Sequence, residues 1–227
     1  MAVNYLNNFN FAAHIQQNLP NGFNQPINNN ACPDQLVGRL VNGTFFPYPI
    51  RADIDYQVRN NNYCINNLIS NDRLVVLLES PHVNEYDPIT GQALGPALGS
   101  TGRYFQNYFS TLLAASRIFV NLNSLTLDVV LANPVQYQCS LGLNLSIPGN
   151  ATLRDRNLIS CFHGGPTSND LDHRLQALRP SFVINLCTTC LRQYVTTYIT
   201  NNYPYNYNFT DGNHPQSWRY PNNRIIN

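Results

Sequence analysis

The chain of 227 residues contains no lysine, since all 13 of its basic residues are arginine. Charged residues make up 11% of the sequence, where an ordinary soluble domain has roughly 25%. The formal net charge is +1, so the composition indicates no strong field that would draw the protein onto nucleic acid. A surface that is poor in charge and rich in asparagine and tyrosine is weakly protected against self-association. Self-assembly is therefore one of the functions to consider.

Long apolar runs are also missing. No stretch approaches the roughly 20 apolar residues that span a bilayer. Residues 1–20 lack the basic region and the unbroken apolar core of a secretory signal. We therefore expect a cytoplasmic protein with no membrane partner. In that compartment the six scattered cysteines are expected to be buried thiols rather than a disulfide framework.

Glutamate is scarce, and both glutamates of the chain, Glu79 and Glu85, follow one short apolar run. This run, residues 74–78, reads LVVLL and is typical of a strand that is buried on both faces of a parallel sheet. Open α/β sheets bind their ligands at the carboxyl ends of such strands. The polar loop after residue 78 is therefore the candidate site, with Glu79 in it and Glu85 interpreted as a solvated loop residue.

Strands and helices alternate from residue 71 onward. The predicted strands are 74–78, 127–132, 182–186 and a last one near 205–209, and the predicted helices are 103–116, 153–162, 169–178 and 189–200. This alternation predicts an α/β domain over residues 71–227, with three αβα layers and a mostly parallel four-stranded central sheet. Residues 1–70 are rich in asparagine, proline and aromatics, and we expect a loop-rich arm packed on the core, with short helices near 10–18 and 54–69.

Polar clusters follow all four predicted strands, and their order resembles the uracil-DNA glycosylase superfamily. LLESPH followed by GPALGSTGRYFQNYFSTLL is similar to the first motif of that family, and VVLANP to its second strand with an asparagine. LQALRPSFVINLCTTCLRQYV resembles the segment in which Arg-Pro precedes a strand, a small-residue turn and a helix. NHPQSW resembles the closing His-Pro-Ser motif. The resemblance covers roughly residues 72–218.

This resemblance implies a uracil-DNA glycosylase-like fold and a role in DNA repair, with DNA, a nucleobase or a nucleotide as partner. It assigns catalysis to Glu79, His82 and His214, because a carboxylate or imidazole activates water and a donor stabilises the leaving base. It assigns base reading to Asn133. The other substrate-binding residues that it implies are Ser80, Pro81, Ala97 and Ser217.

The sequence departs from the family pattern at two of these motifs. Ala97 stands where the family has an aromatic that stacks on the base, and Tyr86 or Tyr104 is the candidate replacement. Gln216 replaces the serine directly after His-Pro, although Ser217 follows. The cysteines lack the spacing of the family members that bind an iron–sulfur cluster, so we expect no cofactor and no metal.

Two other functions stay open at this point. The lysine-free, asparagine-rich composition also suits a self-assembling or inclusion-type structural protein that reuses the fold without catalysis. A nucleotide- or nucleic-acid-binding module without activity is the other alternative, because one fold hosts many functions. A redox or metal role of Cys187 and Cys190 has weak support, since no further ligand stands at metal spacing.

Overall fold

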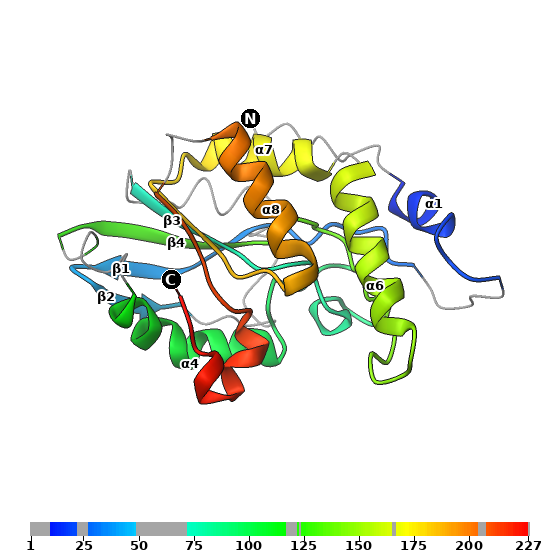
Figure 1. Cartoon of the computed structure of the whole chain (residues 1–227), viewed down its shortest axis with the longest axis horizontal. Helices are drawn as coiled ribbons and strands as arrows, with labels where there is room; N and C mark the ends of the chain where they lie inside the picture. Colours follow the sequence, from blue (N-terminus) through cyan, green and yellow to red (C-terminus); the bar gives the residue numbers. More distant parts are fainter. Residues whose placement is uncertain are drawn as a thin grey trace.

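The computed structural model describes residues 10–21, 27–48, 72–116, 122, 124–164, 167–203 and 208–226. These residues form an α/β fold around one six-stranded sheet with the order β2-β1-β4-β3-β5-β6 (Figure 1). The strands are β1 (Gln35–Val41), β2 (Thr44–Pro47), β3 (Asp72–Leu77), β4 (Thr126–Ala132), β5 (Phe182–Asn185) and β6 (Asn208–Asp211). The α-helices are α1 (Phe11–Gln16), α4 (Ser100–Ala115), α6 (Asn150–Ile159), α7 (Thr167–Leu178) and α8 (Thr189–Asn202).

The four strands predicted from the sequence form the parallel part of this sheet. β3 pairs in parallel with β4 and β5, and β5 pairs in parallel with β6. The apolar run that predicted a doubly buried strand is β3, which lies between β4 and β5, and its residues 74–77 are 0% exposed. The predicted strand near 205–209 is observed as β6, which begins at Asn208.

The prediction of a four-stranded, mostly parallel sheet is wrong, because two further strands make the sheet mixed. β1 and β2 come from the segment that was predicted as a loop-rich arm, and β1 pairs antiparallel with both β2 and β4. Asn42 and Gly43 connect them with φ angles of 48° and 77°. An Asn-Gly pair adopts two positive φ angles at little cost, which is what a tight hairpin of this kind requires.

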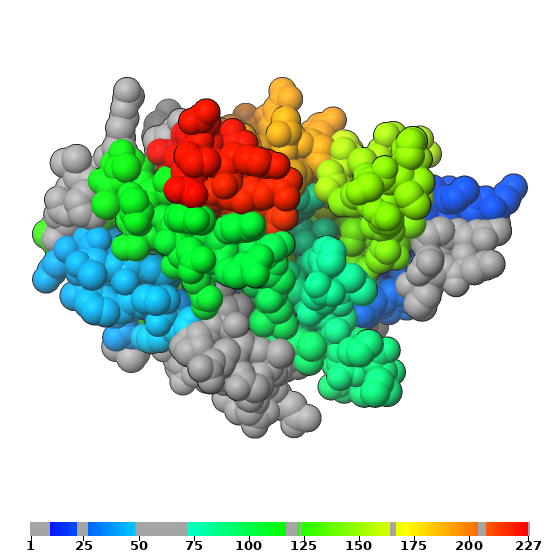
Figure 2. Space-filling view, turned by 90° about the horizontal axis from the view of Figure 1, so that it is seen from below, coloured from blue at the N-terminus to red at the C-terminus, as the bar shows by residue number. Residues whose placement is uncertain are grey.

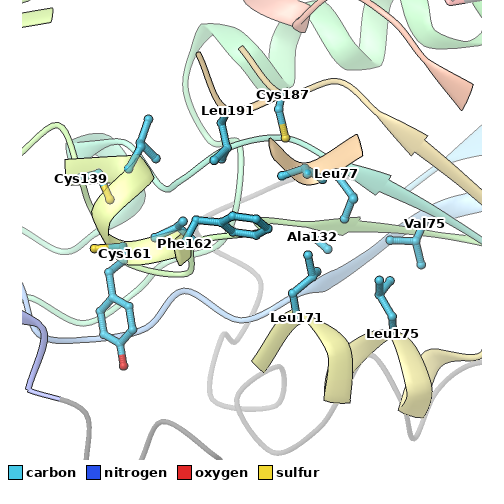
Figure 3. Close-up of a cluster of buried hydrophobic side chains, with 14 of the residues drawn as sticks. Val75, Leu77, Ala132, Cys139, Cys161, Phe162, Leu171, Leu175, Cys187 and Leu191 are labelled. Atoms are coloured by element: carbon cyan, nitrogen blue, oxygen red, sulfur yellow. The ribbon is translucent and has the colours of Figure 1, made fainter. Parts of the chain in front are cut away.

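Helices cover both faces of the sheet, which gives the αβα layering (Figure 1). Alternate strand residues point to opposite faces. Val75 and Leu77 belong to a core with the apolar stripes of α6, α7 and α8, and Figure 3 shows them facing Leu171 and Leu175 of α7. Leu74 and Val76 belong to a second core with α4 and the buried Trp218.

The predicted helices are confirmed within the described residues, with boundaries that move by a few positions. The helix predicted at 153–162 begins at Asn150 and continues as a π-helical turn, η2 (Ser160–Gly164). The short helix expected near 10–18 is α1, whereas the one expected at 54–69 lies outside the described residues. No helix in the described ranges is long and apolar enough to cross a membrane.

Candidate functional site

The carboxyl ends of the parallel strands converge on a cavity of about 300 Å³. Glu79 follows β3, Asn133 follows β4, Thr188 follows β5 and His214 follows β6, and all four side chains line the cavity. In Figure 2 the loop after β3 (teal) lies between α4 with the C-terminal segment on one side and the start of α6 on the other. The edge of the sheet at which the sequence predicted a site therefore contains a cavity.

Seven of the eight predicted site residues line this cavity: Glu79, Ser80, Pro81, His82, Ala97, Asn133 and His214. Ser217 does not, and lines a neighbouring pocket of about 410 Å³ that shares Thr188, His214 and Gln216 with the cavity. The Ser217 hydroxyl donates to the carbonyl oxygen of His214 at 2.7 Å, so it stabilises the turn that carries the histidine.

Asn133 lines the cavity, and its side-chain amide nitrogen is buried and unpaired. Its side chain is almost fully buried, at 2% exposure. The Oδ1 atom accepts from the backbone N–H of Glu79 at 3.3 Å, which fixes the amide so that Nδ2 is the remaining group. Nδ2 has no hydrogen-bond partner among the described residues. Because a buried polar group without a partner costs free energy, this atom suits an acceptor on a bound molecule.

Glu79 is a buried carboxyl group whose ionisation is tuned by its neighbours. Burial raises its pKa from 4.5 to about 7, while Arg154 and Thr188 oppose the rise. The Arg154 Nε atom lies 3.9 Å from Glu79 Oε1, and the hydroxyl and the backbone N–H of Thr188 hydrogen-bond to the carboxylate. A pKa near neutrality allows a carboxyl group to accept and return a proton at physiological pH.

His214 is a half-buried and neutral imidazole. Burial, with the nearby charges of Arg154 and Arg192, lowers its pKa to about 4. Its Nδ1 atom accepts from the backbone N–H of Gln216 at 3.3 Å, where His214 caps the short helix η3 (Pro215–Arg219). Since Nδ1 acts as the acceptor, the proton of the neutral ring is on Nε2. The ring therefore offers one N–H donor at the cavity.

His82 and Glu85 close the turn after β3. His82 caps the short helix η1 (Val83–Glu85): its Nδ1 accepts from the Asn84 N–H, and its own N–H donates to Glu85 Oε2 at 3.1 Å. The His82 side chain lies on the exposed rim of the cavity. The interpretation of Glu85 as a solvated residue is wrong, because Glu85 is 5% exposed and burial raises its pKa to about 8.

Ala97 lies in a turn that the surrounding residues hold in an unusual conformation. Its φ angle is +59°, in the left-handed region, and it is 3% exposed. The backbone N–H groups of Ala97 and Leu98 hydrogen-bond to the Glu85 carboxylate. A Cβ at Gly102 of α4 would meet the Ala97 carbonyl oxygen at 1.6 Å. The hydrogen bonds to Glu85 thus hold the turn on one side, and α4 packs closely against it at Gly102 on the other.

No aromatic side chain of the described residues lines the cavity beside its two histidines. Neither proposed replacement for the missing stacking ring lies there. Tyr86 is buried, and its hydroxyl donates to the Gln136 carbonyl oxygen at 3.4 Å. Tyr104 packs against Tyr108 on α4. The described walls of the cavity, which include Pro81 and Ala97, therefore offer polar and small apolar contacts instead of a stacking ring.

The sequence missed three residues that shape this cavity: Arg154, Ser140 and Glu85. Arg154 lies on α6, and nothing in its sequence neighbourhood indicates that it reaches the edge of β3. Ser140 is 8% exposed, and its hydroxyl has no hydrogen-bond partner in the described part of the chain. A signal did exist for Glu85, because it stands three residues after His82 and completes a capping box.

The described cysteines are free thiols, as expected. Cys32, Cys139, Cys161 and Cys187 are buried, and Cys190 is half-buried. Burial raises the pKa of Cys187 and Cys190, so neither thiol is activated as a nucleophile. Within the described ranges, no group of three or more histidine, cysteine, aspartate or glutamate side chains could hold a metal ion.

Comparison with known protein families and with curated proteins finds no match to this chain. The side chains that line the cavity are therefore the basis for assigning its chemistry. Three residues of distinct character line one cavity: Asn133 with an unpaired amide group, His214 with a neutral imidazole and Glu79 with a carboxyl group that titrates near neutrality. Such a set can hold a polar ring, stabilise negative charge on it and move one proton.

Proposed function

We propose that this protein is a uracil-DNA glycosylase-like hydrolase that cleaves the N-glycosidic bond of a nucleobase in DNA. One observation carries the proposal. Glu79, Asn133 and His214, which belong to three separate strand ends, line the same cavity in protonation and hydrogen-bonding states that suit this reaction. Action on cellular DNA also agrees with the cytoplasmic location expected from the sequence.

Asn133 would bind the base. An enzyme that acts on a base in duplex DNA rotates it out of the stack and contacts its polar edge. The unused Nδ2–H of Asn133 donates to a carbonyl oxygen or a ring nitrogen on that edge, since Oδ1 is occupied by the Glu79 N–H. The buried Ser140 hydroxyl offers a second contact in the same cavity.

His214 would stabilise the leaving base. When the bond from C1′ to the base nitrogen breaks, its electron pair moves onto the base, and negative charge develops at a base oxygen. The Nε2–H of the neutral His214 donates a hydrogen bond to this oxygen, which lowers the barrier in a buried site. The imidazole remains neutral because its pKa lies near 4, so it acts as a hydrogen-bond donor and not as an acid.

Glu79 would activate the attacking water. The water oxygen forms a bond to C1′ while the Glu79 carboxylate takes one of its protons, and that proton is later passed to the base anion. A pKa near 7 leaves about half of the Glu79 side chains ionised at neutral pH. Arg154, 3.9 Å away, favours the ionised form by its positive charge.

The test is the formation of abasic sites in single- and double-stranded oligonucleotides that contain uracil or one of a panel of damaged bases. We expect product with the wild type and a loss of about 100-fold or more in Asn133→Ala and His214→Ala, typical for removal of one donor to developing charge. His163→Ala, at an exposed position away from the cavity, is the matched control and should retain activity. No product on any base would refute the proposal.

Self-assembly is the second candidate function, and one observation favours it. Large apolar side chains are exposed on the described surface, with Ile89 at 92%, Phe46 at 53% and Ile147 at 52%. Charged residues make up 11% of the chain as a whole, so little repulsion opposes contact between copies. Light scattering in the absence of nucleic acid distinguishes the two functions: ordered particles support assembly, and a monomer at all concentrations excludes it.

A further inference from the structure

Arg174 of α7 is the centre of a partly buried ionic cluster that contacts the loop after β4. Its Nη1 atom donates to both carboxylate oxygens of Asp34, at 2.7 and 3.0 Å. Its Nε atom donates to Asp170 Oδ2 at 2.7 Å. The side chains of Arg174, Asp34 and Asp170 are 16%, 8% and 9% exposed. Two carboxylates thus hold one guanidinium in a fixed orientation, away from bulk water.

The third nitrogen of this guanidinium reaches the loop that carries Asn133. Arg174 Nη2 donates to the carbonyl oxygen of Asn133 at 3.0 Å and to that of Pro134 at 3.4 Å. The segment before β1 holds the same loop, because the Cys32 N–H donates to the Gln136 carbonyl oxygen at 2.8 Å. Gln136 Nε2 in turn contacts Asp34 Oδ1 at 3.3 Å.

Few hydrogen bonds hold the Asn133 side chain itself in place. Its single hydrogen bond within the described residues is the 3.3 Å contact from the Glu79 N–H to Oδ1, and Nδ2 is unpartnered. The place of this amide in the cavity therefore depends on the backbone of residues 133 and 134. That backbone follows directly after β4, and beyond the strand the Val135 N–H still donates to the Glu79 carbonyl oxygen at 3.2 Å.

We propose that Arg174, oriented by Asp34 and Asp170, is a positioning residue that sets the Asn133 amide against the base. The catalytic consequence rests on the proposed glycosylase function, whereas the positioning of Asn133 does not. Arg174 does not line the cavity, so its effect passes through Asn133. The segment before β1 thereby takes part in the site through Asp34. A lysine would not replace Arg174, because a single ammonium lacks the planar fork that serves two carboxylates and two carbonyls together.

A double-mutant cycle tests the catalytic part. Arg174→Met should lower single-turnover cleavage by about 10- to 100-fold, the size expected when a reacting partner is displaced by a fraction of an ångström to an ångström. In the Asn133→Ala background the same substitution should change cleavage by less than about twofold, because the group it positions is absent. An equal loss in both backgrounds would show a general structural effect and would overturn the proposal.

Arg39→Met is the matched control. Arg39 also forms a partly buried ion pair, from Nε to Asp128 Oδ1 at 3.0 Å, but it lies on β1 and not at the cavity. It should lower thermal stability without lowering cleavage. Asp34→Asn is a milder second variant, because it keeps the pair of Arg174 with Asp170, and it should lower cleavage in the same direction. A matching loss of cleavage in Arg39→Met would count against the proposal.

A second measurement keeps this inference separate from the glycosylase proposal. The Glu79 backbone N–H donates to Asn133 Oδ1, so its NMR shift and its hydrogen exchange report the position of the Asn133 side chain without any substrate. We expect Arg174→Met and Asp34→Asn to shift this signal and speed its exchange, and Arg39→Met to leave it unchanged. If the wild type cleaves no base, the glycosylase proposal fails, but the Glu79 backbone amide signal still tests whether Arg174 positions Asn133. An unchanged Glu79 amide in Arg174→Met refutes the positioning role.

Discussion

Two carboxyl groups and one imidazole at the cavity are shifted by burial toward their neutral forms. Burial raises the pKa of Glu79 to about 7 and of Glu85 to about 8, and it lowers that of His214 to about 4. Their tasks differ because their neighbours differ. Glu79 lies near the Arg154 guanidinium, whereas Glu85 accepts three backbone N–H groups and holds a turn. At neutral pH Glu79 is therefore the group best suited to proton transfer.

The pH profile of cleavage should report Glu79. The single-turnover rate should rise with pH through about 7 and level off above it, because the carboxylate is the active form. Glu79→Gln should lower the rate by about 100-fold or more and remove this rise. His214 should cause no further change of the cleavage rate above pH 5, because its pKa is near 4. A profile of the wild type that is flat between pH 5.5 and 8.5 would contradict the role of Glu79.

The pH dependence of stability should report Glu85. Its folded-state pKa is raised from 4.5 to about 8, so between these values the folded state binds more protons than the unfolded state. This group therefore makes the free energy of unfolding decrease as pH rises from about 4.5 to 8, by about 1.4 kcal/mol for each unit of pKa difference at most. Glu85→Gln removes the titration.

Urea unfolding at several pH values measures this difference. Between pH 5 and 8 the free energy of unfolding should fall less in Glu85→Gln than in the wild type. Glu79 and His214 titrate in both proteins, so their contributions cancel in the comparison. Parallel curves for the two proteins would show that Glu85 is ionised in the fold at pH 5, contrary to its burial.

Glu79, Asn133 and His214 could be predicted from the sequence because each follows a recognisable strand at the edge where parallel strands end together. Arg154 and Arg174 could not. They lie inside helices, and their contacts join positions that are 75 and 140 residues apart along the chain. Such contacts depend on how α6 and α7 pack on the sheet, and no local pattern encodes that packing.

At the scale of the elements, helix α4 is set against the Ala97 turn by Gly102. A Cβ at this position would meet the Ala97 carbonyl oxygen at 1.6 Å, a contact that requires the backbone to move. Gly102→Ala should therefore lower the free energy of unfolding by about 2–4 kcal/mol, although alanine favours a helix elsewhere.

Gly99 offers the matched control for that substitution. It stands directly before α4, its φ angle is −85°, and no atom lies within 4 Å of a Cβ built there. Gly99→Ala should cost about 1 kcal/mol or less, as for alanine at a helix N-cap. Thermal and urea unfolding of both variants provide the comparison, and equal stability of the two would contradict the close contact between α4 and the turn.

The elements of the parallel half of the sheet were predicted from apolar runs and helical stripes. The β1–β2 hairpin was not, although Asn42-Gly43 stands between QLVGRLV and TFFP, a strong local signal for a tight turn. The asparagine-rich composition of the surrounding segment favoured the prediction of a loop, so Asn42-Gly43 was not interpreted as a hairpin turn. The antiparallel pairing of β1 with β4 also depends on tertiary contacts that span more than 80 residues.

At the scale of the whole molecule, the scarcity of charge limits how strongly the proposed DNA substrate could be held. Three arginines of the described residues stand at or beside the cavity: Arg154 lines it, and Arg192 and Arg219 line the neighbouring pocket. If these three neutralise phosphates of duplex DNA, the slope of log binding constant against log salt concentration is about −3. Fluorescence anisotropy over a range of salt concentrations measures it. A slope steeper than about −6 would require a basic surface beyond these arginines.

Release of free base from DNA, followed by mass spectrometry under single-turnover conditions, tests the central claim most directly. The claim is that Glu79, Asn133 and His214 form one hydrolytic centre in the cavity after β3. Wild-type protein should release a base from at least one substrate in the panel, and Asn133→Ala and His214→Ala should each release it about 100-fold more slowly, while His163→Ala matches the wild type. Release at the wild-type rate by His214→Ala, or no release by the wild type from any substrate, would contradict the claim.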